Sequence, residues 1–191
     1  MIRAMRKEYA SLKRKPFLAP VWILSLLAVV ALFAAAWAVH VATTTVVVVM
    51  RHAEKAGDGT ADPPLNSDGL GRAARLAGVF GRAGPGLGID AIFVTQFQRT
   101  AETAQPLAVQ RAIPVITVPA DDINGLARRI NADFRGQRVL VIAHADTVPA
   151  LVKLMGEGPD VPPIEDNEFG TAYVIAMPRW GRPTVLRLAL P

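Results

Sequence analysis

The feature that most constrains the fold is a charge-free apolar segment near the N-terminus. No Asp, Glu, Lys or Arg occurs in residues 16–42, and residues 17–39 are almost wholly apolar. A helix of this length, at about 1.5 Å per residue, is about 35 Å long and can cross a hydrocarbon core of about 30 Å. Trp22 and Trp37 are near its two ends, where aromatic rings favour the membrane interface. The sequence therefore predicts a transmembrane anchor at 17–39.

Residues 1–16 form a basic tail in front of this segment. Lys and Arg are retained on the cytoplasmic side, so the N-terminus is predicted to be cytoplasmic and a domain at 43–191 to face the periplasm or the cell exterior. The alternative is a cleaved signal peptide, with small residues at 34–38 offering a cleavage site. The apolar run is longer than the 7–15 residues usual for a signal peptide, which favours a single-pass, uncleaved anchor.

The net charge of +5 comes from the basic tail alone. The rest of the chain carries equal numbers of acidic and basic residues, so nucleic acid is not an expected partner. Cysteine is absent, which excludes disulfides, thiolate nucleophiles and Cys-ligated zinc.

After residue 43 the pattern alternates between short β-branched runs and amphipathic segments. Strands are predicted at 44–50, 91–95, 114–118, 138–143, 172–177 and 184–188. Four helices are predicted: one capped by Ser67 or Asp68 and running to Arg82, one from Gln98 to Val109, one capped by Asp121 or Asp122 and running to Phe134, and one from Val148 to Met155. A break is predicted at 84–86. This order predicts an α/β fold, a three-layer α/β/α sandwich with a mainly parallel central sheet, preceded by one transmembrane helix.

Two of the predicted strands end at a histidine. Arg51 and His52 follow the strand at 44–50, and His144 follows the strand at 138–143. Ligands of open α/β sheets bind outside the carboxyl ends of the strands. Both histidines are therefore expected at one crevice.

Arg99, at the start of the helix after strand 91–95, is expected at the same edge. Guanidinium groups match phosphate oxygens, and a helix N-terminus adds N–H donors. A neutral imidazole can attack phosphorus if a backbone carbonyl holds the proton of its other nitrogen. Arg51, His52, Arg99 and His144 are thus the candidate site for phosphate chemistry.

Three ordered segments around these residues carry recognisable signatures. Residues 49–55 (VMRHAEK) contain Arg-His, residues 95–104 (TQFQRTAETA) resemble Ser-x-x-x-Arg-Thr-x-x-Thr-Ala, and residues 142–149 (IAHADTVP) resemble Gly-His-Ser-Asn-Thr-Val-Pro. Together they resemble the histidine phosphatase superfamily, branch 1, also called the phosphoglycerate mutase-like family. Each motif alone is weak, whereas the ordered set is specific.

The resemblance implies roles for the four candidates. His52 would be the phosphorylated nucleophile, and Arg51, Arg99 and His144 would bind the phosphoryl group. The family uses no metal or organic cofactor.

The resemblance also implies an acid that protonates the leaving oxygen, between the second and third segments. That stretch offers Asp121, Asp122 and Asp133. Asp121 or Asp122 is favoured because both follow the third strand.

The chain departs from the family signatures at a few positions. Ala53 and Ala143 replace glycines, and Ala145-Asp146 replaces Ser-Asn. None of these changes removes a candidate residue of the site.

The predicted function is a membrane-tethered phosphomonoester hydrolase acting through phosphohistidine. Its partner would be a small-molecule or protein-borne phosphomonoester, such as an envelope sugar phosphate or a phosphohistidine protein. Two alternatives are a metal-dependent hydrolase using His52, Glu54, His144 and Asp146, and a catalytically degenerate phosphate-binding module.

Other charged residues near the motifs are expected to be structural. Glu54 and Lys55 are interpreted as a solvated pair, Glu102 as a helix-surface residue that could pair with Arg99, and Asp62 as a loop residue.

Overall fold

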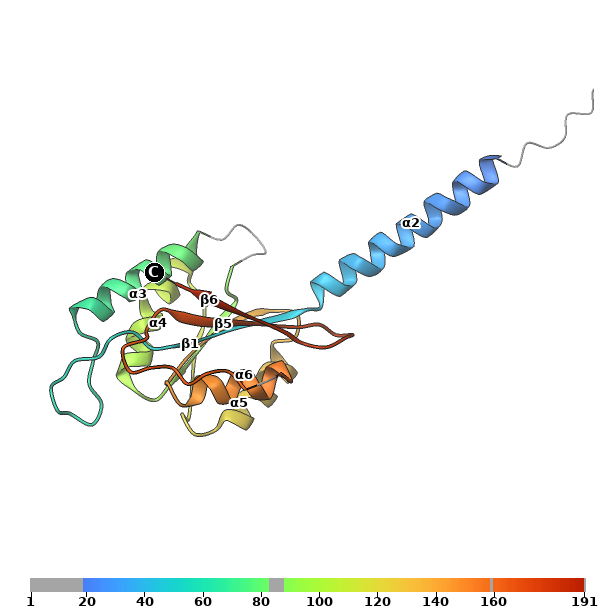
Figure 1. Cartoon of the computed structure of the whole chain (residues 1–191). Helices are drawn as coiled ribbons and strands as arrows, with labels where there is room; N and C mark the ends of the chain where they lie inside the picture. Colours follow the sequence, from blue (N-terminus) through green and yellow to red (C-terminus); the bar gives the residue numbers. More distant parts are fainter. Residues whose placement is uncertain (1–18, 83–87, 159, 191) are drawn as a thin grey trace, which may run out of the picture. The chain divides into compact units, whose positions relative to one another are not determined.

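The computed structural model describes residues 19–82, 88–158 and 160–190, and the chain divides into two compact units, Met1–Val39 and His40–Pro191. The predicted basic tail and the predicted break at 84–86 lie outside the described residues. Figure 1 follows the chain through its labelled elements.

The N-terminal apolar segment is helical. Helix α2 covers Ala19–Ala42, and its part from Val21 to Ala42 is long and apolar enough to cross a membrane. Large apolar side chains are exposed along it, among them Trp22 at 75% and Phe33 at 73%. A helix that is apolar all round and exposed suits lipid rather than water. A signal sequence near the N-terminus can meet the same criterion of length and composition.

The second unit is built on a six-stranded mixed sheet in the order β3-β2-β4-β1-β5-β6. The strands are β1 (Thr45–Arg51), β2 (Ala91–Thr95), β3 (Val115–Val118), β4 (Arg138–Ala143), β5 (Thr171–Met177) and β6 (Thr184–Ala189). The first four are mutually parallel, and β5 and β6 join antiparallel. The predicted mainly parallel sheet is confirmed, with strand ends shifted by one residue at most.

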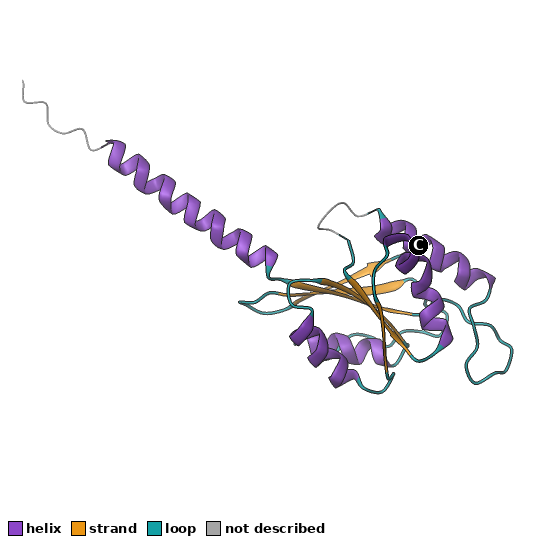
Figure 2. Cartoon of the chain, turned by 180° about the vertical axis from the view of Figure 1, so that it is seen from behind, coloured by secondary structure: helices purple, strands orange, loops and turns teal. Residues whose placement is uncertain are grey.

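Helices cover both faces of this sheet (Figure 2). They are α3 (Ser67–Gly81) and α4 (Gln98–Arg111) on one face, and α5 (Ile123–Asp133) and α6 (Thr147–Gly156) on the other. This confirms the predicted three-layer α/β/α arrangement. The predicted helix ends were right to within two residues.

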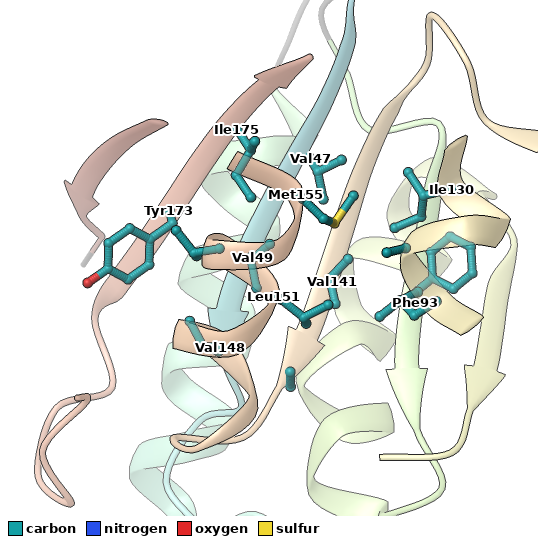
Figure 3. Packing of buried hydrophobic residues seen from close by; sticks show 14 of the residues in the cluster. Val47, Val49, Phe93, Ile130, Val141, Val148, Leu151, Met155, Tyr173 and Ile175 are labelled. Atoms are coloured by element: carbon teal, nitrogen blue, oxygen red, sulfur yellow. The ribbon is translucent and has the colours of Figure 1, made fainter. Parts of the chain in front are cut away.

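The core is divided by the alternation of side chains along β1. Val47 and Val49 pack in the α5–α6 layer with Leu151 and Met155, as Figure 3 shows. Val48 and the fully buried Met50 belong to the other layer. Because successive strand residues face opposite sides, a continuous run of valines fills both layers.

The cap of α3 differs from the prediction. Asn66, rather than Ser67 or Asp68, is the N-cap, and its Oδ1 accepts a hydrogen bond from Gly69 N at 2.8 Å. A Cβ at Gly69 would overlap the carbonyl oxygen of Glu54, so α3 sits directly against the chain that follows β1. The close approach of Gly69 to Glu54 is therefore part of how the first turn of α3 packs.

The ends of β1 and β4 adjoin. Arg51 pairs with Ala143, and His52 N donates to the carbonyl oxygen of Ala143 at 3.0 Å. His52 and His144 therefore emerge side by side at the carboxyl edge of the sheet.

Candidate active site

The four residues singled out from the sequence line one cleft of about 440 Å³. Arg51 and His52 come from the end of β1, Arg99 from the first turn of α4, and His144 from the residue after β4. The imidazole centroids of His52 and His144 are 5.4 Å apart, with the rings inclined at 64°. The cleft thus gathers two imidazoles and two guanidiniums from three segments of the chain.

His52 is held as a neutral imidazole. Its Nδ1 lies 2.7 Å from the carbonyl oxygen of Ala53, which can only accept, so Nδ1 carries the proton. Its side chain is 4% exposed, and burial, opposed by the Ala53 hydrogen bond and helped by Arg99, lowers the pKa of His52 to about 4. The Nε2 lone pair remains available, with no hydrogen bond to the described residues.

The backbone that holds His52 is itself fixed by α4. Ala53 N donates to Thr103 Oγ1 at 3.0 Å, and Thr103 Oγ1 donates to the carbonyl oxygen of Arg99 at 2.6 Å. Thr103, the third threonine of the 95–104 segment, therefore links the nucleophile candidate to the helix that carries Arg99.

Arg51 is positioned by the C-terminal loop before β5. Its Nη1 donates to the carbonyl oxygens of Glu165 at 2.8 Å and Asp166 at 3.0 Å, and its guanidinium lies 4.3 Å from the ring centroid of Phe169. Burial lowers the pKa of Arg51, while Asp166 and Glu54 oppose the shift. An arginine stays charged under such a shift because its ordinary pKa is so high.

Arg99 is positioned by the loop after β1. Its Nη1 lies 3.5 Å from Asp62 Oδ1, and its guanidinium lies 4.3 Å from the ring centroid of Phe97. Asp62 also accepts from Gln98 N at 3.0 and 3.2 Å, so this loop carboxylate caps α4 from outside the helix. The expectation that Asp62 is only a loop residue was therefore incomplete.

Two polar atoms of these arginines are buried without a partner. Among the described residues, Nε of Arg51 and Nε of Arg99 are the buried side-chain nitrogen or oxygen atoms that lack a hydrogen bond. Buried donors are normally paired, and guanidinium N–H groups bind oxyanions strongly. The arrangement is suited to an anion such as a phosphoryl group.

His144 belongs to a chain of hydroxyl groups. Its Nε2 is 3.0 Å from Thr95 Oγ1, which is 3.1 Å from Thr100 Oγ1. Burial, followed by the charge of Arg99, lowers the pKa of His144. Thr95 and Thr100 belong to the sequence motif, although the sequence did not indicate that they orient His144.

The three candidate proton donors have different positions. Asp121 lines the cleft, whereas Asp122 is the N-cap of α5 and accepts from Gly125 N at 2.8 Å. Asp133 forms an i,i+4 pair with Arg129 at 3.9 Å. Of the two favoured candidates, Asp121 is thus the one that faces the cleft.

The interpretation of Glu54 and Lys55 as a solvated pair was wrong. Glu54 Oε1 lies 2.7 Å from Arg72 Nη2 in a partly buried pair, and Lys55 lines the cleft. Desolvation would raise the pKa of Glu54, but the hydrogen bonds to its carboxylate and the nearby charges of Arg72 and Arg75 together outweigh it, and the pKa is lowered. Glu102, which was expected to be able to pair with Arg99, instead accepts a hydrogen bond from Leu65 N at 2.6 Å. It therefore fixes the loop between β1 and α3.

This placement disfavours the metal-dependent alternative. Glu54 is committed to Arg72, and Asp146 accepts from Thr147 N at 2.9 Å as the N-cap of α6. Across residues 19–82, 88–158 and 160–190, no three His, Asp or Glu side chains are grouped to hold an ion.

Part of the chain matches a known protein family. Residues 47–120 match the family model of the histidine phosphatase superfamily (branch 1). This segment is therefore similar to part of a branch 1 histidine phosphatase domain. His52 and Arg99 lie inside the matched range, and His144 follows it.

Solved structures share the fold of this chain. The protein histidine phosphatase SixA with tungstate is 21% identical, with a TM-score of 0.62 over 75% of this chain and 96% of that one. A mycobacterial glucosyl-3-phosphoglycerate phosphatase is 14% identical, with a TM-score of 0.60 over 78% and 100%. SixA from Agrobacterium tumefaciens is 22% identical, with a TM-score of 0.53 over 74% and 97%. Among curated proteins, none matches the sequence.

Proposed function

We propose that this protein is a phosphomonoester hydrolase that works through a phosphohistidine on His52. The observation that carries the proposal is the 2.7 Å contact from His52 Nδ1 to the Ala53 carbonyl oxygen in a buried imidazole whose pKa is lowered to about 4. This contact leaves the other nitrogen, Nε2, unprotonated and nucleophilic at neutral pH.

The first step forms a bond between His52 Nε2 and phosphorus and breaks the bond from phosphorus to the leaving oxygen. Arg51, Arg99 and His144 hold the phosphoryl oxygens and balance their charge. Asp121, which lines the cleft, gives its proton to the leaving oxygen. In the second step, water attacks the phosphohistidine and gives its proton to Asp121, which restores His52 and releases phosphate.

Two substrate classes are favoured by the names of the structural neighbours. One neighbour is a protein histidine phosphatase and another is a glucosyl-3-phosphoglycerate phosphatase. We propose that this chain acts on a phosphohistidine protein or a sugar phosphate.

The proposed enzyme is tethered by α2. We propose an uncleaved single-pass anchor with a cytoplasmic N-terminus and the domain at 43–191 in the periplasm or outside the cell. The length and apolar surface of Val21–Ala42 support this proposal. The mass of the membrane-extracted protein tests cleavage, and protease added to intact cells or spheroplasts tests which side the domain is on.

The decisive experiment is rapid-quench labelling of the full chain. A 32P-labelled phosphomonoester is expected to leave acid-labile, alkali-stable label on His52, and His52→Asn is expected to abolish it. Turnover is expected to persist in EDTA, because no step uses a metal. Phosphate binding without turnover would instead support the binding-module alternative, and turnover abolished by EDTA the metal-dependent one.

A further inference from the structure

The hairpin between β5 and β6 lies at the end of the sheet where β1 begins. Met177, the last residue of β5, pairs with Thr45, the first residue of β1. Residues 178–183 then connect to Thr184, the first residue of β6. Figures 1 and 2 both show this hairpin and the start of β1 at the same end of the sheet.

The hairpin combines cationic and aromatic side chains. Residues 178–183 contain Arg179, Trp180 and Arg182 and no acidic residue. Trp180 is 58% exposed, and the Arg179 guanidinium lies 5.5 Å from its ring centroid. An exposed tryptophan flanked by arginines matches the headgroup region of a membrane, where rings settle and cations meet anionic lipids.

The chain itself keeps this end of the domain close to α2. Only residues 43 and 44 separate Ala42, the last residue of α2, from Thr45. Even fully extended, three steps of the chain span about 10 Å. If α2 crosses a membrane, the start of β1 and the adjoining hairpin are held within reach of the headgroups.

We propose that the β5–β6 hairpin (residues 178–183) docks on the anionic headgroups of the bilayer that holds α2. This inference rests on the proposed transmembrane anchor. A second copy of the chain is a less suitable partner for the hairpin. A two-fold contact between hairpins would place Arg179 and Arg182 of one copy against the same arginines of the other, and like charges repel.

Docking at the hairpin orients the active site. His52 follows the last residue of β1, and seven strand residues at about 3.3 Å each put it about 23 Å from the start of the strand. The cleft therefore opens at the end of the sheet that points away from the bilayer. Its substrate is a phosphomonoester that arrives from the aqueous phase, not a headgroup phosphate of the same membrane.

The absence of cysteine makes a direct test possible in the full chain. An environment-sensitive fluorophore is attached to Thr184→Cys, an exposed position beside the hairpin, or to Ser67→Cys, an exposed position at the active-site end. Each protein is reconstituted into vesicles that contain doxyl-labelled lipid as quencher. With phosphatidylglycerol in the vesicles, strong quenching is expected at 184 and little at 67. With phosphatidylcholine alone, quenching at 184 is expected to fall.

Hairpin variants test the chemistry, with the fluorophore kept at 184. The double variant Arg179→Gln/Arg182→Gln is expected to lower the ratio of docked to undocked domain about 30-fold, because each lost arginine lowers this ratio about fivefold. Arg179→Lys/Arg182→Lys is the matched control and is expected to retain docking, and Trp180→Ala is expected to weaken docking on either lipid. Equal quenching at 184 and 67, or no effect of the glutamine pair, would overturn the proposal.

The outcomes separate this inference from the proposals on which it rests. Resistance to alkaline carbonate extraction reports the anchor independently of the hairpin. Hydrolysis of a soluble aryl phosphate reports the catalytic site and is expected to be unchanged in all of these variants. A membrane-integrated, active protein without quenching at 184 would reject hairpin docking alone.

Discussion

His52 Nδ1 and the carbonyl oxygen of Ala53 are 2.7 Å apart, and this contact fixes which imidazole nitrogen carries the proton and which keeps a free lone pair. The carbonyl accepts a hydrogen bond from Nδ1–H, so the lone pair of the proposed nucleophile is on Nε2. Thr103 Oγ1 accepts a hydrogen bond from the N–H of the same residue, Ala53, which ties the tautomer of His52 to the packing of α4.

A pH titration of His52 tests whether its imidazole is neutral at neutral pH. Burial lowers the pKa of His52 to about 4, so the imidazole is expected to stay neutral through pH 5. The ring NMR signals of His52 in the full chain are expected to titrate near pH 4. They are assigned as the signals that are missing in His52→Asn. A midpoint near 6.5 would show that His52 is solvated and would remove the basis of the proposed nucleophile.

The same shift predicts how stability depends on pH. The unfolded state takes up a proton at His52 near pH 6.5, whereas the folded state does so only near pH 4. The unfolded state therefore binds more protons as the pH falls, and the free energy of unfolding is expected to decrease between about pH 6.5 and 4. Denaturant unfolding at several pH values measures this, and the slope is expected to be smaller in His52→Asn.

Asp121 and Asp122 provide a matched pair for the proton donor. Asp121→Asn is expected to lower kcat about 100-fold or more for alkyl phosphates, and much less for nitrophenyl phosphate, whose leaving oxygen needs no proton. Asp122→Ala is expected to cost about 1 kcal/mol of stability through the lost α5 cap, with no dependence on the leaving group. The reverse pattern would assign the donor role to Asp122.

The Asp62–Arg99 contact predicts separate effects of charge and hydrogen bonding. Asp62→Asn keeps an acceptor for Gln98 N but removes a negative charge next to Arg99, so phosphate is expected to inhibit up to about fivefold more strongly. Asp62→Ala also removes the cap and is expected to lose about 1 kcal/mol of stability. Phosphate inhibition and denaturant unfolding are the two measurements. Weaker inhibition in Asp62→Asn would mean that the carboxylate is needed to position Arg99.

The Glu54–Arg72 pair separates the phosphatase from the metal-dependent alternative. Glu54→Gln weakens a partly buried, charge-assisted pair and is expected to cost about 1 kcal/mol of stability. Because Glu54 has no role in the proposed chemistry, kcat is expected to change little at temperatures where the variant is folded. Loss of turnover that added zinc restores would favour the metal-dependent hydrolase instead.

Much of the fold could be read from local pattern. Four strands rich in β-branched residues, separated by amphipathic segments, predict a covered parallel sheet because each face must be buried. The two strand-end histidines were predicted to share an edge because the carboxyl ends of parallel strands meet there, and β1 and β4 are indeed neighbours. The resemblance then added roles for Arg51 and Arg99 that periodicity alone does not supply.

What the sequence determined by itself was therefore the layers, the edge that carries the site and the four residues that line it. These follow from periodicities and motifs that act over a few residues. Only the tertiary structure decided that Asp62 caps α4 across 36 residues, that the carbonyl of Glu165 holds Arg51 across 114, and that Asp121 rather than Asp122 faces the cleft. Such contacts depend on how loops close in space, and local sequence carries no signal for a partner that distant.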